Sequence, residues 1–435
     1  IYPTSVHRRH CFSCLRPAAE SAEMNTSSEY ELNTPLNGQG GFSNTTRRGL
    51  AAVVSLAVSC FVVGVAVGSR SSVATTPVLS ASATPPPKYS PVGKSEKFRK
   101  KLIFEDDFDT LDFDKWRHEL TMGGGGNWEF EWYTNNRTNS FARNGTLHLH
   151  ATLTADQVGE ELVEEGGTLD LWGATPASQC TTNAFFGCYR TSGAGGNMIN
   201  PIQSAKLRTF ESFNFKYGRM EVRAKLPRGD WLWPAVWLLP KQEIYGQWPA
   251  SGEIDLIEAR GNPGITGGAD TVASTLHWGP TWQDNHWDQT HDEVSLPKGT
   301  GDFVDEWHVF GLFWDEEQLY TYLDTEDNII MMEKFDESFW DKAKKQHEDW
   351  PMDYYNPWQD SKSKSAPYDQ EFYIVMNLAV GGTNKYFGDD LPKKPWTSTS
   401  KHAVDEFWKA RDTWHPTWKG EEADLRVDWI RVWQD

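Results

Sequence analysis

The feature that most constrains the fold of this chain is a series of short strand-like segments joined by long connections. Residues 146–153 alternate four aliphatic with four polar side chains, which is the two-residue period of a half-buried β-strand. Similar segments recur at 218–226, 235–239, 253–258, 309–314, 372–378 and 425–433. The connections are rich in Gly, Pro and Asn, and only 339–348 has a helical pattern. The pattern predicts an all-β sandwich or jelly roll.

Charge and aromatic content restrict the class of ligand. The formal net charge is -19, and binding to a phosphate backbone needs a surplus of Lys and Arg. We therefore expect no nucleic-acid partner, whereas a neutral sugar is compatible with this charge. All 22 tryptophans lie beyond residue 115. Tryptophan fills protein cores and also suits stacking on sugar rings, so we expect several of the 22 to line a binding surface.

The first 49 residues are predicted to form a polar tail. The first methionine is Met24, so either the sequence is a fragment or residues 1–23 precede the start of translation. Residues 24–46 are rich in Asn, Ser, Thr and Gly and contain few apolar side chains, which is typical of disorder. No function is predicted for residues 1–23.

An uncharged segment follows this tail. Residues 50–68 are 19 apolar or small residues that come directly after Arg47, Arg48 and Gly49. A helix of this length spans a bilayer, and the basic pair predicts that its N-terminal side stays in the cytosol. The leading interpretation is a single-pass membrane anchor with an extracellular C-terminal domain. The alternative is a cleaved signal peptide, which would leave a secreted protein.

The rest of the chain is predicted to be a linker and one domain. Residues 69–97 are rich in Ser, Ala, Thr and Pro, as a semi-stiff linker is. Residues 98–435 contain neither an internal repeat nor a second linker. If this domain lies outside the cell, Cys180 and Cys188 are expected to form a disulfide. Asn136 and Asn144 begin Asn-x-Thr sequons and are predicted glycosylation sites.

The segment 253–258 places three carboxylates, Glu253, Asp255 and Glu258, among aliphatic residues. On a regular strand the first two acids share a face, whereas Glu258, five residues after Glu253, points to the other face. One extra residue in a β-bulge near Leu256 and Ile257 would bring all three acids to one face and leave the aliphatic side chains for the core. We predict this bulge.

Three acids on one face suit glycoside hydrolysis. One carboxylate attacks the anomeric carbon and a second protonates the leaving oxygen, and a carboxyl separation of about 5 to 5.5 Å indicates retention of configuration. The middle acid, Asp255, is expected to have a raised pKa through like-charge repulsion and to share a proton with the nucleophile. A calcium cage and an exposed acidic strand are the alternatives. His277 is interpreted as a residue that hydrogen-bonds to substrate.

Several longer motifs resemble one family. The acids form Glu-x-Asp-x-x-Glu, and further motifs lie at 104–109, 125–130, 170–173, 217–221, 229–237 and 427–432. Together these residues resemble glycoside hydrolase family 16, in its branch of laminarinases and animal β-1,3-glucan-binding proteins. The resemblance implies a β-jelly roll of two curved antiparallel sheets with a substrate cleft on the concave face.

The resemblance also assigns roles to individual residues. It implies that Glu253 is the nucleophile, that Glu258 is the acid/base and that Asp255 tunes Glu253. The side chains that it places against sugar are Trp233, Trp237, Arg219 and His277. Catalysis needs no cofactor in this family, but a structural calcium ion is common, and Glu105 and Asp428 are the residues where it would bind here.

Two functions therefore stand at this point. The leading hypothesis is a retaining endo-β-1,3-glucanase that hydrolyses glucans of the laminarin type, and whether water or a sugar accepts the glycosyl group is left open. The alternative is a β-1,3-glucan-binding pattern-recognition protein with little or no hydrolysis. Both catalytic glutamates are kept, unlike in many binding members. We expect a monomer whose partners are β-1,3-glucan and, through residues 50–68, the membrane.

Overall fold

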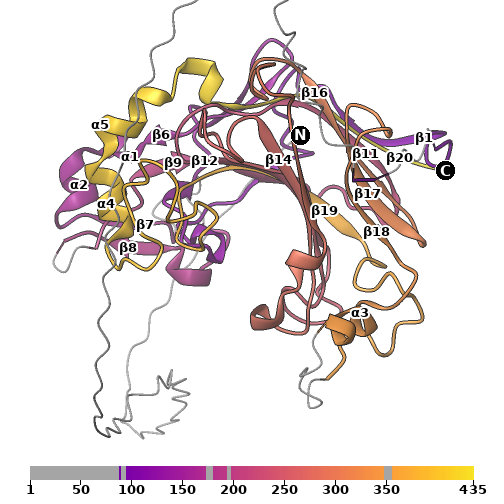
Figure 1. The fold of residues 1–435 in the computed structure, drawn as a ribbon. Helices are drawn as coiled ribbons and strands as arrows, with labels where there is room; N and C mark the ends of the chain where they lie inside the picture. Colours follow the sequence, from indigo (N-terminus) through magenta and orange to yellow (C-terminus); the bar gives the residue numbers. More distant parts are fainter. Residues whose placement is uncertain (1–87, 90–94, 173–179, 194–196, 347–354) are drawn as a thin grey trace, which may run out of the picture. The chain divides into compact units, whose positions relative to one another are not determined.

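The computed structural model describes residues 88–89, 95–172, 180–193, 197–346 and 355–435 (Figure 1). The predicted tail, the predicted anchor at 50–68 and most of the predicted linker lie outside these residues. Within the described ranges, no helix is both long enough and apolar enough to cross a bilayer. The described residues belong to one compact unit that runs to Asp435.

One antiparallel sheet has eight strands. Its order is β18-β17-β16-β11-β20-β5-β4, and β1 also pairs with β20. The strands are β1 (Lys101–Asp106), β4 (Ser140–Ala142), β5 (Leu147–Leu149), β11 (Gly218–Lys225), β16 (His308–Trp314), β17 (Gln318–Leu323), β18 (Ile329–Lys334) and β20 (Leu425–Gln434).

The second antiparallel sheet has seven strands in the order β15-β14-β13-β12-β19-β10-β2. The strands are β2 (Arg117–His118), β10 (Lys206–Arg208), β12 (Leu232–Pro240), β13 (Glu253–Ala259), β14 (Thr271–His277), β15 (His291–Ser295) and β19 (Phe372–Val380). This sheet carries the acidic strand β13 near its centre.

Smaller elements complete the domain. The short strands are β3 (Glu131–Tyr133), β6 (Thr152–Leu153), β7 (Thr168–Asp170), β8 (Tyr189–Thr191) and β9 (Ile202–Ser204). The helices are α1 (Thr154–Val158), α2 (Glu160–Glu164), α3 (Phe339–Gln346), α4 (Ala403–Lys409) and α5 (Arg411–Trp414). In Figure 1, α1, α2, α4 and α5 gather beside β7 and β8, away from α3.

The core lies between the two large sheets. Alternate side chains of β13, β12 and β19 point inward, and Ile257, Val236 and Met376 lie directly opposite one another and are fully buried. The other sheet supplies buried residues such as Val222 and Ile430. Burial of these aliphatic faces removes a large apolar area from water, which is the main stabilisation of such a sandwich.

The predicted all-β architecture and the predicted strands are confirmed, with two differences. Residues 146–153 form two strands in different sheets: β5 pairs with β4 and β20, whereas β6 pairs with β9. The amide of His150 donates to the carbonyl of Asn139, where the chain leaves the large sheet. In addition, the short helices α1, α2, α4 and α5 were not predicted. Cys180 and Cys188 are joined by a disulfide, with 5.5 Å between their Cα atoms.

Candidate active site

Strand β13 contains the predicted bulge. Asp255 lies opposite Thr275 and Glu258 lies opposite Ala273, so Leu256 and Ile257 together face one residue of β14. That residue is Ser274, whose buried hydroxyl donates to the carbonyl of Leu256 at 2.9 Å. The extra residue shifts the parity of the strand, so Glu258 joins Glu253 and Asp255 on one side of the sheet.

We call this side of the seven-stranded sheet the acid face. Its first row of side chains crosses from Asp255 to Trp237, because these two residues lie directly opposite each other on β13 and β12. Its second row crosses from Glu258 through Ala235 to Asn377 of β19. Directly opposite residues in antiparallel strands share a face, so the register alone brings the acids beside Trp237 and Asn377.

Each outer acid accepts a hydrogen bond from a tryptophan. The indole nitrogen of Trp248 donates to Oε2 of Glu253 at 2.6 Å. The indole nitrogen of Trp233 donates to Oε1 of Glu258 at 3.0 Å. Both glutamates remain partly exposed, whereas the middle acid Asp255 is buried. The outer acids are therefore held in place and still reach a ligand.

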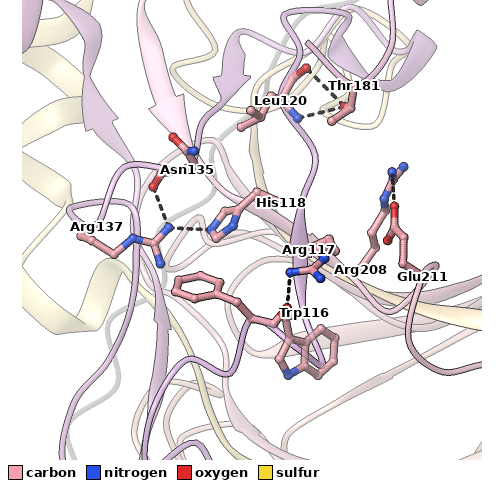
Figure 2. A pocket seen from close by; sticks show the side chains of 10 residues that line it. Trp116, Arg117, His118, Leu120, Asn135, Arg137, Thr181, Arg208 and Glu211 are labelled. Atoms are coloured by element: carbon pink, nitrogen blue, oxygen red, sulfur yellow. Dashed lines mark hydrogen bonds and ion pairs between the residues drawn. The ribbon is translucent and has the colours of Figure 1, made fainter. Parts of the chain in front are cut away.

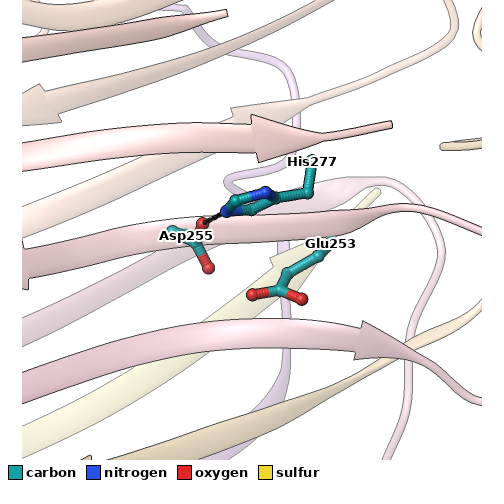
Figure 3. Close-up of side chains that lie close together, drawn as sticks. All are labelled: Glu253, Asp255 and His277. Carbon is teal, nitrogen blue, oxygen red and sulfur yellow. Dashed lines mark ion pairs between the residues drawn. The ribbon is translucent and has the colours of Figure 1, made fainter. Parts of the chain in front are cut away.

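His277 is the partner of the middle acid (Figure 3). Its Nε2 lies 3.1 Å from Oδ2 of Asp255, within ion-pair distance but without the alignment of a hydrogen bond. Its Nδ1 lies 2.8 Å from the side-chain amide nitrogen of Asn285. His277 therefore lies between Asp255 and Asn285.

The three acids all have raised pKa values. Burial, and then the adjacent Asp255 carboxyl, raise the pKa of Glu253 to about 8. Burial, together with the charge of Glu258, holds the pKa of Asp255 well above its usual range, as the sequence predicted for the middle acid. Burial also raises the pKa of Glu258 to about 7, although His277 and the hydrogen bond from Trp233 oppose this rise. The cluster therefore keeps protons at neutral pH.

Aromatic side chains flank the acids. Trp233 is buried and stacks on Tyr386 with 3.8 Å between ring centroids, and Arg260 lies 4.3 Å from the centre of the Tyr386 ring. Trp237 is partly exposed, and its indole nitrogen donates to Oδ1 of Asn377 at 2.6 Å. Of these two tryptophans, Trp237 has the more accessible ring for a ligand.

The predicted sugar contact of Arg219 is wrong. Arg219 lies on β11 of the eight-stranded sheet and is 1% exposed. Its guanidinium pairs with Glu326 at 2.9 Å, donates to the hydroxyl of Tyr322 at 2.9 Å and reaches the carbonyl of Ser95 at 3.3 Å. Arg219 therefore connects Ser95, near the end of the predicted linker, to the eight-stranded sheet. This sheet does not carry the three acids.

The residues predicted for calcium do not form a carboxylate cluster. The carboxylate of Asp428 pairs with Arg223, and Glu105 lies opposite Arg431 on the neighbouring strand. These side chains are a poor donor set for calcium, which takes six to eight oxygen ligands. Among the described residues, only Glu253, Asp255 and His277 place three potential metal ligands within 4.8 Å of one another. Calcium at Glu105 and Asp428 stays a prediction.

Both predicted glycosylation sites are in turns. Asn144 is exposed in the turn between β4 and β5, and Asn136 is partly exposed in the connection from β3 to β4. Both asparagines are therefore on the surface, and their modification stays a prediction.

Sequence reasoning missed several residues of the site. Trp248 was one of 22 tryptophans without a distinguishing pattern, and Tyr386 comes from a connection far along the chain. Lys206 lies opposite Asn377 on the acid face, with its ammonium 4.9 Å from the Trp237 ring.

Comparison with known proteins decides the family. The sequence profile described as glycosyl hydrolases family 16 matches residues 129–341. A protein of Penaeus monodon named β-1,3-glucan-binding protein is 48% identical over 341 residues, which cover 77% of this chain and 90% of that protein. The chain belongs to glycosyl hydrolases family 16.

Other family 16 relatives carry two kinds of name. β-1,3-glucan-binding protein 2 of Manduca sexta is 31% identical over 76% of this chain, and the match spans 64% of that longer protein. A glucan endo-1,3-beta-glucosidase of Cryptopygus antarcticus is 29% identical over 72% of this chain and 92% of that protein. The relatives of this chain thus include proteins named for binding and a protein named for hydrolysis.

Proposed function

We propose that this family 16 chain recognises β-1,3-glucan, which binds along the acid face. The observation that carries the proposal is the partly exposed ring of Trp237 beside the acids, with Asn377 and Lys206 around it. An aromatic ring surrounded by amide, ammonium and carboxyl groups offers stacking and hydrogen bonds to a neutral sugar chain. The names of the Penaeus monodon and Manduca sexta relatives support the same ligand.

Retaining endo-hydrolysis of the bound glucan is the second candidate function, because all three acids lie together on one face. Glu253 would attack the anomeric carbon while Glu258 gives its proton to the leaving oxygen. Water, deprotonated by Glu258, would then cleave the glycosyl ester and restore both acids. The name of the Cryptopygus antarcticus relative supports this chemistry.

The protonation of Glu253 separates the two candidates. With a pKa of about 8, Glu253 is mostly protonated at pH 7 in the ligand-free protein and is then a poor nucleophile. Hydrolysis requires Asp255 to hold the proton that it shares with Glu253, so that the glutamate is ionised. Binding requires no such transfer, and the relatives named for binding are more similar to this chain than the relative named for hydrolysis, so we place recognition first.

Laminarin oligosaccharides test both functions in one experiment. Calorimetry with the wild-type chain and with Trp237→Ala measures binding, and we expect the substitution to weaken it. Reducing-sugar release by the wild-type chain and by Glu253→Gln measures hydrolysis. Binding without release supports recognition, and release that stops in Glu253→Gln supports hydrolysis. Absence of binding and of release would reject the proposal.

We also propose that the domain works outside the cell. The disulfide and the surface position of both sequons support passage through the secretory pathway. Extraction of the full chain from membranes with carbonate separates the two proposed routes. A protein that stays in the membrane supports the anchor at 50–68, and a protein in the medium that lacks this segment supports cleavage.

A further inference from the structure

A cavity of about 550 Å³ lies at the edge of the seven-stranded sheet, where β2 ends the sheet (Figure 2). We call it the arginine cavity. Its lining residues are Phe113, Trp116, Arg117, His118, Leu120, Asn135, Arg137, Thr181, Arg208 and Glu211. None of these residues is used by the proposed function, and Arg137 is the middle residue of the Asn136 sequon.

Strand register connects the arginine cavity with the acids. Asp255 lies opposite Trp237, Trp237 opposite Val375, Val375 opposite Arg208, and Arg208 opposite Arg117. Because directly opposite residues share a face, these five side chains form one row across the acid face. Four strand spacings separate the ends of the row, which is about 19 Å. A short oligosaccharide that lies across the strands at Asp255 would reach both arginines.

The arginines of the cavity are poorly neutralised. Arg117 donates to the carbonyl of Phe113, and Arg137 donates to Nε2 of His118 and to the carbonyl of Asn135. In the part of the chain that the structure describes, neither arginine forms an ion pair with a carboxylate. Both side chains are exposed, so their charges are accessible to a ligand.

The third arginine, Arg208, has carboxylate partners and also one N–H group without a hydrogen-bond partner. Arg208 bonds to Glu211 at 3.0 Å and to Glu119 at a longer 3.5 Å, while its buried Nε has no hydrogen-bond partner. His118 adds no charge, because burial and then Arg137 lower its pKa to about 3. Three guanidinium groups therefore line the cavity with one carboxylate, that of Glu211, while Glu119 lies outside the lining and also pairs with Lys206 at 3.1 Å.

We propose that the arginine cavity binds an anionic group, a sulfate ester or a carboxylate, carried by a glucan that lies along the acid face. The inference rests on the proposed function for the neutral part of the chain. Guanidinium groups bind such oxyanions in a bidentate manner, and the exposed ring of Phe113 offers a surface for the sugar that carries the anion. The negative charge of the whole domain repels a densely charged polymer. The cavity therefore favours a glucan that carries only a few anionic groups.

Three forms of one laminarin backbone test this inference: the neutral polymer, a sparsely sulfated form and a form with some C6 groups oxidised to carboxylates. Calorimetry at low ionic strength compares their affinities for the wild-type chain, for Arg117→Gln/Arg137→Gln and for Arg143→Gln. Arg143 pairs with Glu421 at the turn between β4 and β5 and serves as the matched control for loss of one cation.

We expect the wild-type chain and Arg143→Gln to bind a charged form about tenfold more tightly than neutral laminarin. The preference falls as salt is added. The double variant loses the preference and keeps its affinity for neutral laminarin, which also shows that it is folded. The single variant Arg117→Gln, altered at an exposed position, shows an intermediate preference. Preference for one charged form identifies sulfate or carboxylate as the anion.

Two results would overturn the inference and leave the proposed function intact. One is equal affinity of the wild-type chain for the neutral and both charged laminarins. The other is an unchanged preference in the double variant, which would place the anion elsewhere. Failure of neutral laminarin to bind the wild-type chain is a different result, because it rejects the proposed function itself.

Discussion

The indole nitrogen of Trp233 lies 3.0 Å from Oε1 of Glu258. The ring of the same tryptophan stacks on Tyr386, which itself lies under Arg260. The stack fixes the direction of the indole N–H, and the hydrogen bond fixes the carboxyl group that is predicted to act as acid/base. A donor to a carboxylate favours its ionised form, so Trp233 moderates the pKa that burial raises.

Trp233→Phe tests this role. The phenyl ring keeps an aromatic contact with Tyr386 but has no N–H, so the pKa of Glu258 should rise above about 7. Titration of the carboxyl carbons by ¹³C NMR measures the shift without any need for activity. Trp237→Phe is the matched control, because the N–H of Trp237 donates to Asn377. Identical Glu258 titrations in both variants would contradict this role.

The raised pKa of Glu253 predicts how stability depends on pH. The folded protein keeps the proton of Glu253 up to about pH 8, whereas the unfolded chain releases it near 4.5. Between these values the unfolded state binds fewer protons, so stability falls as pH rises. Glu253→Gln removes this loss, so the stability of the variant relative to the wild-type chain should rise by on the order of a few kcal/mol from pH 4.5 to pH 8.

Urea unfolding at several pH values measures this gain. Glu161→Gln, on the exposed surface of α2, should follow the wild-type curve. A variant Glu253→Gln whose stability tracks the wild-type chain from pH 4.5 to pH 8 would show that Glu253 ionises normally.

The accessible ring of Trp237 predicts a loss of affinity. Trp237→Ala should weaken laminarin binding by about 1–3 kcal/mol if the ring covers a sugar, measured by calorimetry. Trp429→Ala is the control, because Trp429 belongs to β20 of the other sheet. Equal affinities of the two variants would leave Trp237 as a structural residue.

The predicted acid role of Glu258 can be separated from its effect on structure. If the chain hydrolyses glucan, Glu258→Ala should lower the rate on laminarin by about 10²–10⁴-fold. An aryl glucoside with a good leaving group needs no acid and should be cleaved at a nearly normal rate by the same variant. Equal losses on both substrates would reject Glu258 as the acid.

Local pattern predicted much of the fold and the central site. Strand parity alone required the bulge, because Glu258 could not otherwise share a face with Glu253. The local sequence pattern could not predict which distant segments come into contact. Arg219 is part of a family motif on β11, yet its partner Glu326 lies on the connection between β17 and β18. Only the folded sheet brings the two side chains together. Tyr386 likewise reaches Trp233 only through tertiary packing.

The bulge at Leu256 and Ile257 also limits how this strand can change. Removal of either residue would restore a regular strand and return Glu258 to the apolar side, where an unpaired carboxyl group is costly. Insertion of a residue there would disturb the pairing with β12 and β14 in the same way. Insertions and deletions in β13 are therefore expected to be damaging. A homologue that lacks one of the acids should carry a substitution at that position and keep the length of the strand.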